Sequence, residues 1–147
     1  MNKKIILIAD HRGFKLKEDL IFKLKELNIG YDLIDVNSSY NKGDDYPLLV
    51  KKAMKLMRKD DKGVFICGSG VGVCIAANRY KNIRAVNGHS VSEVKLARRD
   101  EDVNVLCLAG NDLSFRKAYK MIDIFLNSSF KDIERYQRRL KQLKRIG

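Results

Sequence analysis

The chain has few prolines, which interrupt helices and strands, and few cysteines, which could cross-link a fold. Its 147 residues include one proline, no tryptophan and three cysteines. With a single proline, no Ser/Gly-rich tract and no internal repeat, we expect one domain over residues 1–147. An odd number of cysteines without paired CxxC spacing excludes a disulfide scaffold and favours a reduced, cytoplasmic setting.

Long apolar runs are also absent. The uncharged stretch at residues 64–78 is broken by three glycines and is too short to cross a bilayer. The apolar run near the N-terminus ends at Asp10 and favours a strand over a signal segment. No His, Cys, Asp or Glu residues follow a metal-ligand spacing, so we expect no metal and no other cofactor.

Acidic residues are in the minority. The chain has 30 Lys and Arg against 18 Asp and Glu, a formal net charge of +12. Much of the excess lies on amphipathic stretches such as residues 15–25 and 51–59, which favours solvated helix faces. The basic end, residues 131–147, would suit an anionic substrate or non-specific contact with nucleic acid. Among its helical arginines only Tyr136 is aromatic, so we expect no specific nucleic-acid partner.

Strand and helix patterns alternate along the chain. Short apolar segments predict five strands, at residues 4–9, 31–36, 64–66, 83–87 and 103–108. Helical periodicity predicts helices at residues 14–27, 47–57, 90–99 and 114–126, another that starts near residue 69, and a last one at about 131–146. This alternation predicts an α/β fold, a three-layer α/β/α sandwich with a five-stranded parallel sheet.

Polar residues and glycines gather at the predicted carboxyl ends of these strands. Residues 10–11 follow the first strand, 67–72 the third, 88–90 the fourth and 109–112 the fifth. Because the strands are parallel, topology alone brings these segments to one edge of the sheet. Ligands bind at that edge, near the point where the strand order reverses. We therefore expect a binding site there.

The segment after the third strand is the most informative. Glycines alternate after Cys67, at positions 68, 70 and 72, before a helical run. They let backbone N–H groups turn toward an anion, and the helix start adds its positive dipole end. The same field favours the thiolate form of Cys67, which we expect to be open to a solute. The spacing GxGxG is not a dinucleotide fingerprint, and no Walker lysine follows. A tight turn beside a buried cysteine is the alternative.

Other candidate side chains have plain alternatives. Asp10 could be a helix N-cap, and His11 a surface residue of the first turn. His89, the other histidine, lies in a predicted loop. Arg135 and Arg139 are four residues apart, so they share a helix face that could clamp one phosphate or could simply be solvated.

Together these motifs resemble the ribose-5-phosphate isomerase B family, which includes related sugar-phosphate isomerases. The resemblance spans nearly the whole chain and is carried by residues 9–17, 45–47, 67–72, 75–78, 83–86, 104–106 and 135–139. One motif alone would be weak, whereas this ordered set is specific. It implies a Rossmann-like fold and a homodimer or tetramer. It also implies active sites at the subunit interface, to which the C-terminal helix contributes.

The resemblance implies a chemistry as well. It implies interconversion of ribose 5-phosphate and ribulose 5-phosphate through a cis-enediolate, without metal. In that scheme Cys67 moves a proton between C1 and C2, and Ser69 helps to position it. Asp10 binds sugar hydroxyls and Tyr46 lines the pocket. The implied binding set also contains the loop residues Gly68, Gly70, Val71 and Gly72, whose amides stabilise the enediolate, and the phosphate ligands His11, Arg135 and Arg139.

The chain departs from the family pattern at two places. Asp100 and Glu101 stand where members carry a His-Asn pair whose histidine opens the furanose ring, and Asn111 stands where a phosphate-binding arginine is usual. We place all three in the site, with Asp100 as the catalytic candidate for ring opening. A carboxylate is a poor acid near neutral pH, so His89 or spontaneous opening are alternatives for that step.

Three functions are therefore open. The first is a pentose-phosphate isomerase. The second is an isomerase of another sugar phosphate, such as a tetrose 4-phosphate, which cannot form a furanose ring and needs no ring-opening residue. The third is a catalytically degraded homologue that acts as a binding protein.

Overall fold

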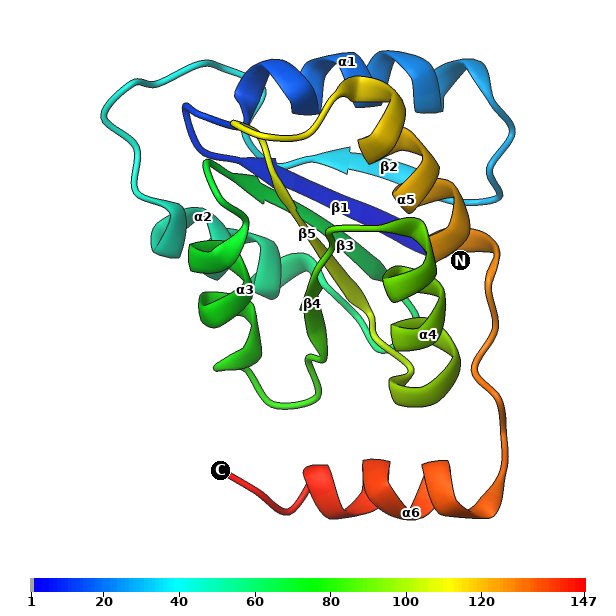
Figure 1. The fold of residues 1–147 in the computed structure, drawn as a ribbon. Helices are drawn as coiled ribbons and strands as arrows, with labels where there is room; N and C mark the ends of the chain where they lie inside the picture. Colours follow the sequence, from blue (N-terminus) through cyan, green and yellow to red (C-terminus); the bar gives the residue numbers. More distant parts are fainter. Residues whose placement is uncertain (1) are drawn as a thin grey trace.

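The computed structural model describes residues 2–147 and contains one sheet of five strands (Figure 1). The strands are β1 (Lys4–Ala9), β2 (Asp32–Asp35), β3 (Lys62–Cys67), β4 (Ala85–Asn87) and β5 (Val105–Ala109). Their order is β2-β1-β3-β5-β4, and every pairing is parallel. All the strands expected from the sequence are present, with small shifts in their bounds.

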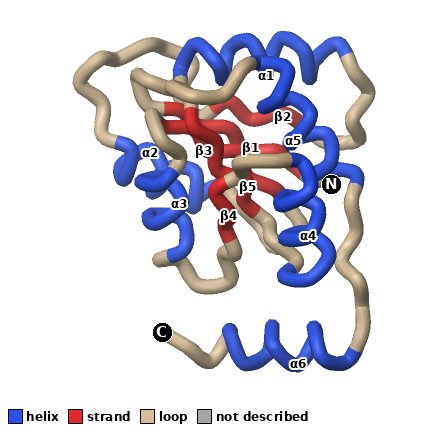
Figure 2. The backbone as a smooth tube through the Cα atoms, viewed as in Figure 1, coloured by secondary structure: helices blue, strands red, loops and turns tan. Residues whose placement is uncertain are grey.

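Helices cover both faces of this sheet. They are α1 (Phe14–Glu26), α2 (Tyr46–Leu56), α3 (Val71–Asn78), α4 (Val91–Glu101), α5 (Phe115–Asn127) and α6 (Glu134–Leu143). Helices α1, α4 and α5 pack on one face through residues such as Leu20, Val94 and Met121, and α2 and α3 pack on the other through Val50 and Val73. Figure 2 shows the strands between these two groups. The predicted three-layer α/β/α sandwich is confirmed.

The inner strands carry the continuous apolar runs. In β1, β3 and β5 every residue beyond Lys4 and Lys62 is buried, whereas the edge strands β2 and β4 are mostly half-buried. A central strand covered on both faces has no solvated side, so it needs apolar residues throughout. Successive residues serve opposite layers: Ile66 faces the α1/α4/α5 layer, and Phe65 and Cys67 face the α2/α3 layer.

Strand register aligns the carboxyl ends of the central strands. Ala9 pairs with Ile66, and Cys67 pairs with Ala109. The turns after β1, β3 and β5 therefore leave the sheet side by side. The chain passes from β1 to β2 on one side and then to β3 on the other, so the strand order reverses between β1 and β3. This is the position at which parallel sheets bind ligands.

The C-terminal helix stands apart from the sandwich. Within α6 the buried residue is Tyr136. The amide of Lys131 donates to the carbonyl of Arg99 at 2.9 Å and ties the approach to α6 to the end of α4. Figure 1 shows α6 at the end of the molecule opposite to the strand carboxyl ends. The helix is shorter than the expected 131–146, because the backbone is still extended at Ile133.

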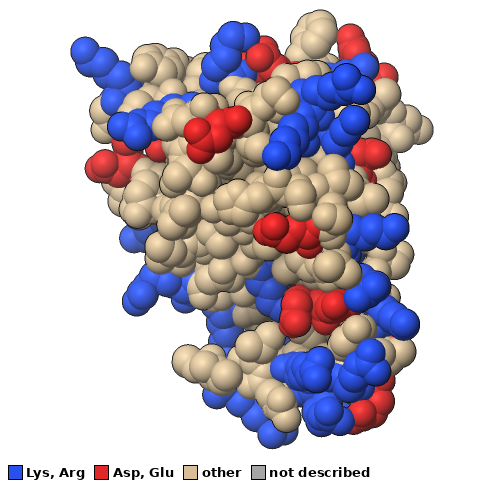
Figure 3. All heavy atoms as spheres, viewed as in Figure 1, with Lys and Arg blue, Asp and Glu red and all other residues tan. Residues whose placement is uncertain are grey.

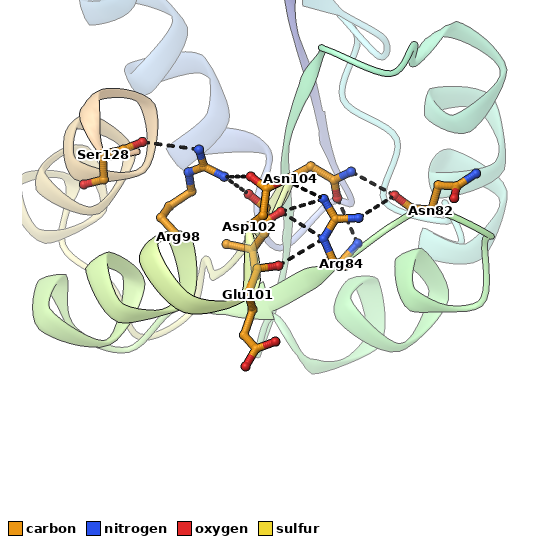
Figure 4. Close-up of polar contacts among 8 residues, drawn as sticks. Asn82, Arg84, Arg98, Glu101, Asp102, Asn104 and Ser128 are labelled. Carbon is orange, nitrogen blue, oxygen red and sulfur yellow. Dashed lines mark hydrogen bonds and ion pairs between the residues drawn. The ribbon is translucent and has the colours of Figure 1, made fainter. Parts of the chain in front are cut away.

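A polar network closes the sheet at that opposite end (Figure 4). The Arg84 guanidinium donates to the Asp102 carbonyl at 2.8 Å and to its carboxylate at 3.1 Å. The buried Arg98 donates to the other carboxylate oxygen of Asp102 at 2.8 Å and to the Ser128 carbonyl at 3.2 Å. Asp102 adopts φ 46° just after α4 and turns the chain toward β5. The network therefore fixes the end of α4 relative to β4 and the approach to α6.

Candidate active site

Most of the predicted site residues lie together at the carboxyl edge of the sheet. The amide of Asp10 donates to the Ile66 carbonyl at 3.1 Å and ties the turn after β1 to β3. The amide of Asn111 donates to the Gly68 carbonyl at 3.0 Å and ties the turn after β5 to the same loop. The predicted residues gathered at this edge are Asp10, His11, Tyr46, Cys67, Gly68, Ser69, Gly70, Val71, Gly72 and Asn111.

The glycine loop (residues 68–70) joins β3 to α3. Gly70 has φ +77°, a left-handed conformation that suits glycine, and it directly precedes α3. A Cβ at Gly70 would meet the Oδ1 atom of Asn87, so the loop passes close to the end of β4. The ring of Tyr46 lies against Gly72 in the first turn of α3, where a Cβ would be 2.7 Å from its Cζ atom. Neighbours on both sides therefore hold this turn at the start of α3.

Cys67 ends β3 with its side chain in the α2/α3 layer. The residue is only 4% exposed and packs in an apolar cluster with Val73 and Cys107. The expectation of an open thiol is therefore wrong for the single chain, because the α2/α3 layer covers the sulfur. Beside it, Ser69 and Val71 are exposed whereas Gly68 and Gly70 are buried, and the Ser69 hydroxyl accepts the Val71 amide at 3.2 Å.

The other two thiols form a pair behind this loop. A hydrogen bond from the Cys107 thiol lowers the pKa of Cys74 to about 7 from an ordinary value of 9.0, although burial acts in the opposite direction. Burial raises the pKa of Cys107 well above its ordinary value. All three cysteines are free. No pattern in the sequence indicated the acidity of Cys74.

Asp10 is not the N-cap of α1, a position that Gly13 occupies without a side-chain cap; it shapes the turn before the helix instead. Its side chain is buried, and Oδ1 accepts the amide of Arg12 at 3.0 Å and that of Gly13 at 3.2 Å. These bonds satisfy donors of the turn that leads into α1. Asp10 therefore shapes the turn that carries His11 and Arg12.

His11 is held by Asp44, a residue that the sequence did not single out. The Oδ1 atom of Asp44 accepts the His11 amide at 2.9 Å and lies 2.9 Å from the ring Nδ1. Because a carboxylate can only accept, Nδ1 carries a proton and the other ring nitrogen, Nε2, is left for a ligand. Asp44 belongs to the polar loop before α2, and folding alone brings it to β1. No local pattern signals this pair.

The remaining predicted residues lie at the opposite edge of the sheet. Asp100 and Glu101 end α4, which leads into the amino end of β5. Arg135 and Arg139 lie on α6, over which Figure 3 shows Lys and Arg side chains gathered. A single chain therefore does not bring these four residues to Cys67. We name the two sets the carboxyl-edge set and the α4–α6 set.

Asp100 is engaged by its own neighbour. Arg99 donates from Nε to Oδ1 at 2.5 Å and from Nη2 to Oδ2 at 3.1 Å. These bonds lower the pKa of Asp100, and Tyr136 and Arg135 act in the same direction. Asp100 is therefore a carboxylate at neutral pH, which speaks against its expected role as an acid in ring opening. Glu101 is exposed.

Known proteins share this architecture and sequence. The model of the Ribose/Galactose Isomerase family matches residues 5–143. The chain belongs to the ribose/galactose isomerase family. The resemblance expected from the motifs is thus confirmed.

Individual members match over almost their full length. A probable ribose-5-phosphate isomerase B of Mycoplasma genitalium is 35% identical over 147 residues, 97% of this chain and 95% of that protein. The ribose-5-phosphate isomerase B of Escherichia coli is 32% identical over 146 residues, 98% and 96% of the two chains. The crystal structure of the Mycoplasma genitalium isomerase with bound ribulose 5-phosphate matches with a TM-score of 0.86 and 34% identity, over 99% and 96% of the chains.

These relatives place the chain among enzymes that isomerise sugar phosphates. In the described part of this ribose/galactose isomerase, residues 2–147, no group of three or more His, Cys, Asp and Glu side chains is arranged to hold a metal ion. Across the same residues, no helix has the length and apolar character needed to span a membrane.

Proposed function

We propose that this chain interconverts ribose 5-phosphate and ribulose 5-phosphate through a cis-enediolate, with Cys67 as the base. The main support is the position of Cys67. It is the last residue of a central strand, beside the point where the strand order reverses, and directly precedes the glycine loop that opens α3. The related Mycoplasma genitalium structure holds ribulose 5-phosphate, a ligand of the class that such an edge binds.

The proposed reaction moves one proton between two carbons. The Cys67 thiolate removes the proton from C2 of the open-chain aldose, and the electron pair of that bond forms the C1–C2 double bond. The O1 atom then carries the negative charge. The proton of the O2 hydroxyl passes to O1, and the Cys67 thiol returns its proton to C1 to form the ketose. Atoms and charge balance without any added reactant.

The glycine loop would stabilise the intermediate. Amides at a helix start are fixed donors that need no reorientation when the enediolate forms. Removing one such donor typically costs about 2.7–4 kcal/mol of transition-state stabilisation. Because Cys67 is only 4% exposed in the free chain, the side chains that cover its sulfur must shift before it can reach a substrate carbon, and its catalytic contact would form only in the complex.

We further propose that two copies of the chain share each site. The α4–α6 set cannot reach Cys67 of its own chain, because the two sets lie at opposite edges of the sheet. A second copy could bring Arg135 and Arg139 to the carboxyl edge, where they would bind the substrate phosphate beside His11. A homodimer would then carry two such sites, and a tetramer four.

Exposed apolar side chains support this assembly. Leu48, Val71 and Ile75 are 60%, 49% and 58% exposed on α2 and α3, next to the glycine loop. Leu143 and Ile146 are exposed at the far end, along a groove of about 470 Å³ beside β4. Exposed apolar side chains grouped in this way mark candidate contact surfaces for a partner. Dimer formation would cover them at both ends.

Turnover and its dependence on Cys67 test the reaction. We expect the protein to convert ribose 5-phosphate to ribulose 5-phosphate, and Cys67→Ala to lower kcat by more than about 100-fold, the least that a proton-transfer group usually contributes. Cys74→Ala is the matched control, because it removes a thiol from α3 and should keep most of the activity. Full activity of the folded Cys67→Ala protein would refute the role of Cys67.

Mixing two inactive variants tests the sharing of sites. Cys67→Ala and Arg139→Gln proteins are each expected to be inactive or nearly so. Unfolding and refolding them together should restore about a quarter of the wild-type activity, because half of the dimers are mixed and each mixed dimer has one intact site. If the mixture stays inactive while the variants demonstrably exchange subunits, the sites are not shared.

The ion pair of Asp100 favours a second candidate. A carboxylate bonded to Arg99 is a poor proton donor, so this chain lacks an evident acid for opening a furanose ring at that position. An isomerase of a tetrose 4-phosphate needs no such acid. Comparing kcat/KM for erythrose 4-phosphate and ribose 5-phosphate decides between the two substrates. If neither turns over but either binds, the chain is a binding protein.

A further inference from the structure

The side chain of Arg12 lies across the glycine loop. A Cβ at Gly68 would be 2.8 Å from Cδ of Arg12 and 3.4 Å from its Nη1. The same Cβ would be 2.9 Å from Nδ2 of Asn111. Gly68 directly follows Cys67, so the Arg12 stem and the Asn111 amide both cover the backbone next to the proposed base. The absence of a side chain at Gly68 makes this approach possible.

The turn that carries Arg12 is rigid. The Arg12 amide is bonded to the buried Asp10 carboxylate at 3.0 Å. On the other side, a Cβ at Gly110 would be 2.7 Å from the Arg12 carbonyl oxygen, so the turns after β1 and β5 are in close contact. The backbone of Arg12 is therefore held by the Asp10 carboxylate after β1 and by the turn after β5.

The charged end of Arg12 is unengaged. Within residues 2–147 its guanidinium makes no hydrogen bond, ion pair or ring contact, whereas the nearby Lys15 pairs with Asp19 at 3.0 Å and His11 pairs with Asp44. The Oδ1 atom of the nearby Asp10 already accepts two backbone amides. Arg12 is an exposed residue, so its guanidinium donors are available to a ligand beside the loop.

We propose that Arg12 binds the phosphate group of the substrate and, with the Asn111 amide and His11, forms the part of the phosphate site that this chain itself supplies. The inference rests on the proposed function, since it assigns a residue to the same site. A guanidinium offers two parallel N–H groups that match two phosphate oxygens, which an amide or a single ammonium cannot do. The Asn111 side chain supplies an uncharged hydrogen-bond donor, and Arg12 supplies the positive charge beside it.

The substrate phosphate is a better ligand to assign to Arg12 than the enediolate oxygens. The enediolate forms next to Cys67, where backbone amides of the loop are already available. Arg12 and His11 are consecutive in one turn. The Arg12 guanidinium is always a donor, whereas the His11 ring, whose Nδ1 is bonded to Asp44, donates from Nε2 only as the imidazolium. Two neighbouring cationic or polar donors at the solvent side suit a dianion that stays charged throughout the reaction. Arg12 should therefore affect substrate binding and not the chemical step.

Binding and turnover are measured separately to test this. Inorganic phosphate and ribose 5-phosphate are titrated by calorimetry into the wild-type protein, Arg12→Gln and Arg12→Lys. The matched control is Arg116→Gln, the same change at an exposed arginine in the first turn of α5 at the same edge. Arg12→Gln should weaken phosphate binding about tenfold, the lower range for a lost charge-assisted bond at an exposed site.

The kinetic readout has a defined pattern. For Arg12→Gln, KM for the sugar phosphate should rise by the same factor while kcat changes little, and Arg12→Lys should fall between Gln and wild type. The wild-type affinity should also decrease more steeply with salt than that of Arg12→Gln. Arg116→Gln should behave as wild type.

Failure of the inference differs from failure of the proposed function. If the wild-type protein isomerises the sugar phosphate and Arg12→Gln binds phosphate equally well, Arg12 is not a phosphate ligand. A fall in kcat with unchanged phosphate affinity would equally overturn the assignment. If turnover is absent but phosphate binding depends on Arg12, the phosphate site stands and the isomerase proposal does not.

Discussion

Replacing Gly70 by alanine tests whether the glycine loop is held as described. The residue has φ +77°, and an added Cβ would meet Oδ1 of Asn87 and lie 3.1 Å from the Leu108 carbonyl carbon. The left-handed backbone costs about 1–2 kcal/mol for a residue with a side chain. Overpacking against buried neighbours adds about 1–3 kcal/mol. Gly70→Ala should therefore lower the free energy of unfolding by about 2–5 kcal/mol, a large share of a typical total.

A double-mutant cycle separates the two contributions. Asn87→Ala removes the oxygen that the new Cβ would meet, and it loses only one hydrogen bond, from Nδ2 to the Ser69 carbonyl at 3.3 Å. In that background the Leu108 carbonyl carbon remains, so Gly70→Ala should cost the backbone term of about 1–2 kcal/mol and a smaller overpacking term. The coupling between the two sites should then be most of the overpacking term of about 1–3 kcal/mol.

Urea unfolding followed by far-UV circular dichroism measures all four proteins, because the chain has no tryptophan to report by fluorescence. Activity should fall further in Gly70→Ala than in Asn87→Ala, since only the first change displaces the loop amides. An equal cost of Gly70→Ala in both backgrounds would show that Asn87 does not confine the loop. A cost near zero would refute the left-handed turn itself.

Two further predictions follow from shifted pKa values. The rate of iodoacetamide alkylation at Cys74, mapped by mass spectrometry, should rise with pH around a midpoint of about 7, because the Cys107 hydrogen bond favours the thiolate. A midpoint near 9 would contradict the lowered pKa of Cys74. Burial and the nearby Arg98 lower the pKa of Lys62 from 10.5 to about 8. Between pH 8 and pH 10.5 the unfolded chain therefore binds more protons than the folded chain, and the free energy of unfolding rises with pH. Lys62→Met should therefore be more stable than wild type at pH 7, and this gain in unfolding free energy should shrink between pH 8 and 10.5. A gain that does not change with pH would show that Lys62 titrates normally.

The sequence determined the layers of the fold. Continuous apolar runs between helical segments leave no solvated strand face, so they require a parallel sheet covered on both sides. Local signals placed most elements well: Pro47 marked the first turn of α2, and Ser90 and Ser114 cap α4 and α5 by accepting the amides of Glu93 and Lys117. The last helix was predicted too long, because a basic amphipathic pattern does not reveal where an exposed helix begins.

The sequence also located the carboxyl-edge set, because parallel strands bring their ends together whatever their order. It did not determine the side chains that complete this edge. Asp44 reaches His11 from a loop 33 residues away, and Arg12 is placed over Gly68 by the packing of two turns. Such contacts depend on relative positions of elements, which local residue patterns do not encode.

Tertiary structure alone decided which predicted residues can act together in one chain. Motifs that the sequence predicted to form one site lie at opposite edges of the sheet in the single chain. This is because α4 runs back from the carboxyl edge and places Asp100 and Glu101 near the amino end of β5. It also decided that Cys67 is covered, since the alternation along β3 turns its side chain into the α2/α3 layer. A sequence pattern specifies which faces are apolar, whereas distance and access arise only when those faces pack.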